Sequence, residues 1–149
     1  VWATHALYAV PESELDAALE RFVRAMDGAG FIAHASKNAH YLRFYQYYID
    51  GFKGGMGVPF SSAESIVESL NRLGVDFQVS HISYENGAPE GAKSQVEGYL
   101  QRCLFDDTIS LEAMRANPII GQYLDTCLKA GQWRFEQCVM LLFFRRANR

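Results

Sequence analysis

The spacing of apolar residues predicts strands and helices in alternation along most of the chain. Residues 1–10 form an apolar stretch with β-branched and aromatic side chains, typical of a buried strand that runs into a loop. Apolar residues then recur every three or four positions over 15–26, which predicts a helix. A second short apolar run, 31–35, is best interpreted as a buried parallel strand. Residues 1–35 therefore predict a strand–helix–strand crossover.

The middle of the chain is rich in aromatic residues and glycine. Aromatic side chains crowd residues 39–52, where their spacing follows a helical period only loosely. The glycine-rich stretch 51–57 separates them from a helix over 62–73, which is predicted by a capping Ser–x–x–Glu pattern and an apolar stripe. Apolar and polar residues alternate over 75–83, which predicts the next strand.

The last third predicts three helices and a final strand. The helices are expected over 92–104, 110–117 and 119–128, and the apolar run over 135–144 predicts a central strand. Residues 145–149 are mostly polar and basic and predict a solvated tail. This order of strands and helices predicts an α/β fold built on a mostly parallel sheet.

Composition limits the class of protein. A chain of 149 residues with 49% apolar and 21% charged residues is expected to form one globular domain, 1–149. A net charge of -3 argues against a nucleic-acid partner. No apolar run approaches the roughly 20 residues that span a bilayer. The three cysteines and four histidines lack the spacing of a disulfide framework or a metal site, so we expect a cytoplasmic protein without a metal.

The order of elements resembles the C-terminal half of the class I S-adenosylmethionine-dependent methyltransferases. In that family a strand like 2–10 is followed by a helix, a glycine-containing turn like 27–30 and a strand like 31–35. The last strand, here 135–144, inserts antiparallel between the two before it. The resemblance implies a partial Rossmann-like sheet of the last four strands, helices on both faces, and a helical insertion or lid over 84–131. That insertion narrows the likeness to the histamine N-methyltransferase-like branch.

The same resemblance implies transfer of a methyl group from S-adenosylmethionine to a small-molecule acceptor. In the family, a glycine-rich turn after the first strand and an acidic residue after the second hold the cofactor. Neither is present in this sequence, because its one glycine-rich stretch follows a helix rather than a strand. We therefore expect this chain to supply the acceptor side, to be inactive alone, and to need a cofactor-binding half from the same chain or from a partner chain.

Polar residues at the predicted strand ends are the first candidates for the site, because ligands of open α/β sheets bind there. The resemblance places Ala3 and Thr4 against the cofactor and His5 toward the acceptor, which His5 could orient or deprotonate. Tyr8 could contact the acceptor through its hydroxyl or ring, although a core tyrosine is an equal alternative. His34 lies inside an apolar run, and we expect it to be packed.

A second group of candidates comes from the aromatic segment and the last strand. The resemblance matches His40 and Phe44 to aromatic positions of the acceptor pocket, and Gln137 to an amide on the substrate side. Aromatic walls of this kind stack on planar ligands or attract cations. The alternative is that the rings only pack a helix on the sheet, and that Gln137 marks the exposed start of a strand.

Two functions of other classes stay open at this point. One is a non-catalytic methyltransferase-like module that binds a partner chain through the open edge of its first strand. The other is a small stand-alone α+β pocket enzyme of the isomerase or cyclase type. The latter would need a curved antiparallel sheet, whereas the spacing of strands and helices in this sequence favours crossovers.

Overall fold

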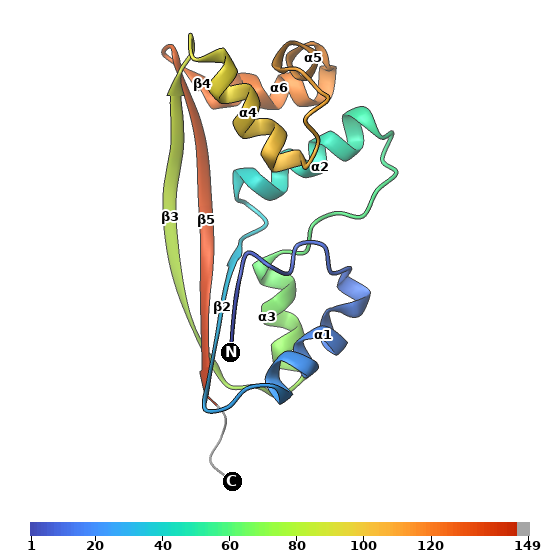
Figure 1. Ribbon diagram of the computed structural model, residues 1–149, viewed down its shortest axis with the longest axis vertical. Helices are drawn as coiled ribbons and strands as arrows, with labels where there is room; N and C mark the ends of the chain where they lie inside the picture. The colour runs from blue at the N-terminus through green and yellow to red at the C-terminus, as the bar shows by residue number, and fades with distance from the viewer. Residues whose placement is uncertain (146–149) are drawn as a thin grey trace.

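The computed structural model describes residues 1–145, in which a mixed sheet of five strands is covered by six helices (Figure 1). The tail predicted over 145–149 lies, beyond Arg145, outside the described residues. The predicted order of elements is confirmed, with one short strand added. In chain order the elements are β1 (Trp2–Thr4), α1 (Glu12–Arg24), β2 (Ala29–Ala35), α2 (His40–Phe52), α3 (Ala63–Arg72), β3 (Phe77–Pro89), α4 (Lys93–Leu104), α5 (Leu111–Ala116), α6 (Pro118–Cys127), β4 (Leu128–Lys129) and β5 (Gln132–Arg145). No helix up to residue 145 is both long and apolar enough to cross a membrane.

The strand order is β1-β2-β5-β3, with β4 paired to the start of β5. β1 and β2 are parallel, whereas β5 is antiparallel to both β2 and β3. The last strand therefore lies between the two preceding long strands, as the resemblance implied. The sheet is mixed rather than mostly parallel, because its central strand β5 runs antiparallel to both of its long neighbours. It is also not the wholly antiparallel sheet that a pocket enzyme of the isomerase or cyclase type would need.

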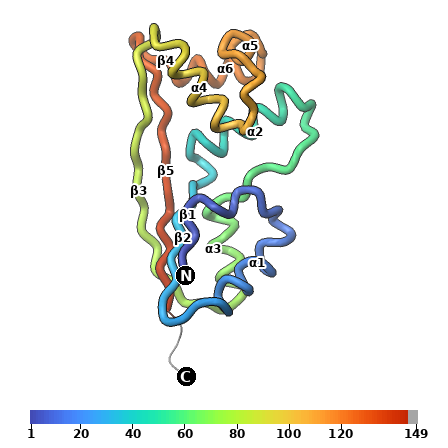
Figure 2. The backbone as a smooth tube through the Cα atoms, in the orientation of Figure 1, coloured from blue at the N-terminus to red at the C-terminus, as the bar shows by residue number. Residues whose placement is uncertain are grey.

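Two strands differ in length from the sequence-based expectation. β1 is much shorter than the expected 1–10, because His5 adopts a left-handed backbone conformation with φ 51° that turns the chain away from the sheet. β3 continues six residues beyond Ser83 to Pro89, so the segment 84–131 is helical only from Lys93. As the tube in Figure 2 shows, β3 and β5 run side by side along most of the length of the molecule.

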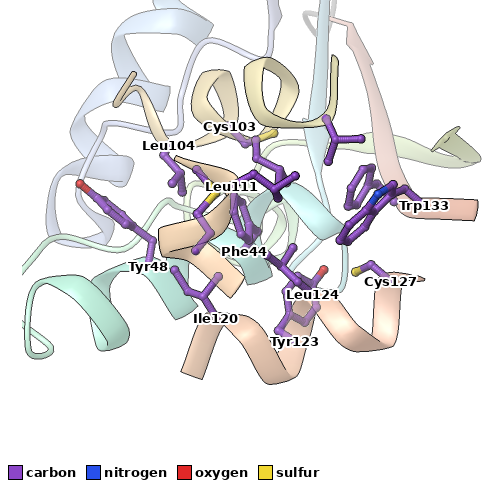
Figure 3. Packing of buried hydrophobic residues seen from close by; sticks show 14 of the residues in the cluster. Phe44, Tyr48, Cys103, Leu104, Leu111, Ile120, Tyr123, Leu124, Cys127 and Trp133 are labelled. Atoms are coloured by element: carbon purple, nitrogen blue, oxygen red, sulfur yellow. The ribbon is translucent and has the colours of Figure 1, made fainter. Parts of the chain in front are cut away.

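Two hydrophobic clusters hold the helices on the sheet. The larger one packs α2, α4, α5 and α6 onto Trp133 and Phe135 of β5 (Figure 3). The smaller one packs α1 and α3 onto Leu142 and Phe144 of the same strand. Trp133 and Phe135 alternate with Leu142 and Phe144 along β5, but the long strands twist, and in Figure 1 all six helices lie on the same side of β3 and β5, with α1 and α3 at one end and the other helices at the other. The expectation of helices on both faces is therefore not confirmed.

One part of the sheet carries apolar side chains that the described helices leave uncovered. Trp2 pairs with Phe31, and Phe31 pairs with Phe143, so the three side chains share one face. The Phe31 and Phe143 ring centroids are 4.8 Å apart. Trp2 is 82% exposed and Phe143 46% exposed. We call these three residues the aromatic row; β1 beside it also has one edge without a strand partner in the described structure.

Candidate functional site

A cavity of about 320 Å³ lies at the carboxyl ends of the two parallel strands. β1 and β2 run in the same direction, so their ends near Thr4 and Ala35 meet at one edge of the sheet. Ala35 lines the cavity, together with His5 and Tyr8 from the loop that follows β1. Ligands of open α/β sheets bind at this kind of edge, so the cavity is the candidate site of this fold.

The remaining walls come from elements that the topology brings to the same edge. α2 and α4 stand over the cavity, and the middle parts of β3 and β5 form its floor. Four tyrosines give it aromatic walls with hydroxyl groups, while single amide and thiol groups add polarity. The lining residues beyond β1 and β2 are Tyr41, Tyr84, Asn86, Tyr99, Arg102, Cys103, Phe105, Gln137 and Val139.

His5 and Tyr8 form a hydrogen-bonded pair on the cavity wall. The Tyr8 hydroxyl oxygen lies 2.5 Å from Nδ1 of His5. Burial raises the pKa of Tyr8 well above its usual value, so the phenol stays protonated and donates to Nδ1. Partial burial lowers the pKa of His5, so the imidazole is neutral and free to accept. The Tyr8 oxygen can therefore take a proton from a ligand while passing its own proton to His5.

Hydrogen bonds from Ser61 hold the loop that carries this pair, and His34 in turn holds Ser61. Ser61, just before α3, donates from its backbone N–H to the Tyr8 carbonyl at 3.2 Å and from Oγ to the Leu7 carbonyl at 2.7 Å. Nε2 of His34 donates to the Ser61 carbonyl at 2.9 Å, and the His34 ring lies 4.1 Å from the Tyr8 ring. His34 is packed as expected, and desolvation lowers its pKa to about 4. A neutral histidine thus supports the back of the Tyr8 ring.

Gln137, predicted as a substrate-side amide, does line the cavity, but both ends of its amide are engaged by protein. Nε2 donates to the Tyr99 hydroxyl at 3.0 Å, and Oε1 accepts from the backbone N–H of Tyr41 at 3.4 Å. The amide therefore ties α2 and α4 to β5. This arrangement suits a residue that positions two cavity tyrosines more than one that contacts a ligand directly.

His40 and Phe44 do not reach the cavity. Both are buried in the larger cluster, where Phe44 is labelled in Figure 3. Nδ1 of His40 lies 2.8 Å from the Tyr123 hydroxyl, and desolvation lowers the pKa of His40 to about 3. Residues four apart share one face of a helix, so this face of α2 packs on α6 while Tyr41 reaches the cavity. For this pair the structure supports the packing alternative.

The two residues expected against the cofactor differ in their surroundings. Ala3 is buried in the smaller cluster, so its methyl group packs toward α1 and α3 and only its backbone is left for a ligand. Thr4 is exposed at the carboxyl end of β1, and its hydroxyl forms no hydrogen bond within residues 1–145. Neither residue lines the cavity, whereas the adjoining His5 does.

Sequence reasoning missed the wall that α4 contributes. Tyr99, Arg102 and Cys103 all face the cavity, but in the sequence Tyr99 and Cys103 belong to the apolar stripe that predicts the helix. The spacing of Tyr99 and Arg102 could have indicated this wall, because residues three apart lie on one face of a helix. Asn86 was missed because Asn86-Gly87 is typical of a turn, and the structure makes it part of β3.

Comparison with known proteins gives a fold and no family. No family model and no curated protein matches the sequence. Among solved structures, a Bacillus halodurans C-125 protein that is provisionally assigned as a methyltransferase is similar, with a TM-score of 0.53 and 11% sequence identity. The match covers 99% of this chain and 64% of that one, so this chain spans less than two thirds of its length. At this identity the likeness shows a methyltransferase-like fold.

Proposed function

We propose that this chain forms the acceptor side of an S-adenosylmethionine-dependent methyltransferase that acts on a small molecule. The observation that carries the proposal is the position of the cavity. It lies at the shared carboxyl edge of β1 and β2, in a sheet whose last strand inserts antiparallel between β2 and β3. The similarity in fold to the Bacillus halodurans protein supports the same assignment.

The residues of this chain suit one side of such a cofactor. The exposed Thr4 hydroxyl and the backbone of Ala3 stand at the carboxyl end of β1, beside the cavity wall formed by His5. When bound, S-adenosylmethionine supplies an electrophilic methyl group. The glycine-rich turn and acidic residue that would hold its other side are absent from the sequence, so the proposal includes a second, cofactor-binding half.

The surface for that half is the free edge of β1 together with the aromatic row. An unpaired strand edge offers backbone N–H and C=O groups to another strand. The exposed rings of Trp2 and Phe143 beside it would be buried by an apolar partner. Both features support a sheet that continues beyond β1, whether the added strand comes from the same chain or from a separate one.

The cavity would assist methyl transfer mainly by alignment and water exclusion, because the reaction is a displacement that requires donor and acceptor in line. The tyrosine walls would orient a planar acceptor under α4. An acceptor oxygen or nitrogen that gives up its proton would pass it to the Tyr8 hydroxyl oxygen, as the Tyr8 proton moves to Nδ1 of His5. The products of this step are a deprotonated acceptor and an imidazolium.

The first test is a calorimetric titration of S-adenosylhomocysteine. We expect no binding by this chain alone and binding by the longer protein or complex that contains the cofactor-binding half. Binding by neither would overturn the methyltransferase assignment. It would favour the alternative of an interaction module that uses the free edge of β1, for which the exposed aromatic row is the specific supporting observation.

The second test concerns the proton acceptor. In the complete enzyme, His5→Asn should lower turnover about a hundredfold, the lower end of what a general base contributes. Asparagine tolerates the left-handed backbone of this position, so the fold should be kept. His81→Asn on exposed β3 is the matched control and should leave turnover unchanged. Unchanged turnover in His5→Asn would remove His5 from the mechanism.

A further inference from the structure

The lining of the cavity carries positive charge without negative charge to balance it. Among its lining residues, Arg102 is the one with a permanent charge, and none is an aspartate or glutamate. His5 is held neutral, because burial lowers its pKa. Burial also raises the pKa values of the lining tyrosines Tyr8, Tyr41 and Tyr99, so none of them supplies a phenolate at neutral pH. A ligand in this cavity therefore meets one cation and no anion.

The guanidinium of Arg102 is available to a ligand. It is exposed on α4 and forms no ion pair within residues 1–145. The acidic side chains nearest in sequence do not neutralise it. The Asp106 carboxylate accepts hydrogen bonds from the Thr108 and Tyr48 hydroxyls, at 2.6 and 2.8 Å. Asp106 and Asp107 line a second depression beside α4 together with Arg102, but neither forms an ion pair with it in the described part of the chain.

The shape and the lining favour one planar ring. About 320 Å³ is near the lower limit for ligand cavities. Tyr8, Tyr41 and Tyr99 offer ring surfaces for stacking, and Tyr8 and Tyr41 already lie 4.8 Å apart between ring centroids. An aliphatic or aromatic amine would have only ring faces to attract it and would be repelled by Arg102. A carboxylate can instead form two parallel hydrogen bonds with a guanidinium.

We propose that the cavity binds a single-ring aromatic carboxylate, with the carboxylate on Arg102 and the ring among the tyrosines. This proposal rests on the proposed function and names the acceptor class for it: a ring hydroxyl or amino group at the Tyr8–His5 side is the group to be methylated. α4 supplies the anchor and the loop after β1 supplies the proton acceptor, so the two roles come from different walls.

The test compares three probes of similar size and different charge in low-salt buffer. They are 4-hydroxyphenylacetate, its neutral amide and tyramine, titrated into the protein and followed by amide chemical shifts. We expect the carboxylate to bind about three- to fivefold more tightly than the amide, the upper part of the range for one exposed ion pair, and tyramine to bind most weakly. The shifts should centre on His5, Tyr8 and the α4 wall.

Two variants assign the preference to its residue. Arg102→Gln should abolish the difference between the carboxylate and the amide while both still bind. Arg21→Gln makes the same charge change on exposed α1, far along the sequence from the cavity walls, and should preserve it. Equal or tighter binding of tyramine, a preference that survives Arg102→Gln, or no binding of any probe would each overturn the proposal. Cofactor binding, measured separately with S-adenosylhomocysteine, decides the proposed function whichever of these results is found.

Discussion

Acid should destabilise this fold well before its carboxylates titrate, because two buried histidines must stay neutral in the native state. His34 is 0% exposed and His40 2% exposed, and desolvation lowers their pKa values to about 4 and about 3. In the unfolded chain both return to about 6.5. Below pH 6.5 these two histidines therefore bind protons in the unfolded state but stay unprotonated in the native state. The free energy of unfolding falls as the pH falls.

The size of the effect follows from the shifts. Each pKa unit corresponds to about 1.4 kcal/mol, so each histidine should remove about 2 kcal/mol of stability between pH 7 and pH 5. Together they remove about 4 kcal/mol, a large share of the 5–15 kcal/mol typical of a domain. The stability is fully present above pH 6.5 and is lost toward pH 4. Carboxylates with lowered pKa, such as Asp16 at about 2, contribute only at lower pH.

Urea unfolding followed by circular dichroism between pH 5 and pH 7.5 measures this slope. Glutamine at either histidine can replace the hydrogen bond to Ser61 or Tyr123 without titrating. His34→Gln and His40→Gln should each remove about 2 kcal/mol of the stability lost between pH 7 and pH 5, whatever they cost at pH 7.5. His81→Gln on exposed β3 should leave it unchanged. A wild-type stability that is flat between pH 7 and pH 5 would refute the reasoning.

Three further outcomes are expected. Leu142→Ala removes a fully buried side chain from the smaller cluster and should cost about 2–5 kcal/mol by urea unfolding. Val79, its register partner on the same face, is 40% exposed on β3 and should cost under about 1 kcal/mol when replaced by alanine; equal losses would contradict the burial of Leu142 under the helices. Tyr8→Phe keeps the ring but removes the hydroxyl, so it should cost about 1 kcal/mol and lower methyl transfer by the complete enzyme at least tenfold; full activity would exclude the Tyr8 relay. Burial raises the pKa of Cys103 to about 11, so at pH 8 iodoacetamide should alkylate it more slowly than the half-buried Cys138, as mass spectrometry can show; the reverse order would mean that the cavity opens wider than described.

The fold was predicted from sequence to a large extent, because its elements have strong local signals. Helices over the expected ranges are present, and the central position of the last strand follows from its continuous apolar run. The strand ends were predicted less well. Local preference makes Asn86-Gly87 a turn, but its pairing with Phe135 and Arg134 of β5 keeps the segment extended. Tertiary contacts outweigh turn propensity at that point.

The candidate site was predicted only where topology determines it. His5 and Tyr8 follow the first strand, and any α/β order of this kind brings a strand end to the ligand edge. The aromatic helix carried no such information. From sequence alone, His40, Tyr41 and Phe44 could each line a cavity. The packing of α2 against α6 buries the other two and leaves Tyr41 at the cavity. Arg102 had no local signal, because a charged residue on an amphipathic helix is ordinarily solvated.

The central place of β5 has a consequence for synthesis on the ribosome. β3 has no strand partner other than β5 in the described structure, and the larger cluster is also completed by Trp133 and Phe135. The sheet therefore cannot close until residues 132–145 have left the exit tunnel. Until then the nascent chain carries a long unpaired strand with Val79 and Ile82 exposed, the kind of segment that invites aggregation or chaperone binding. The sheet of this domain should therefore form only after β5 has been synthesised, through contacts between residues that are distant in the sequence.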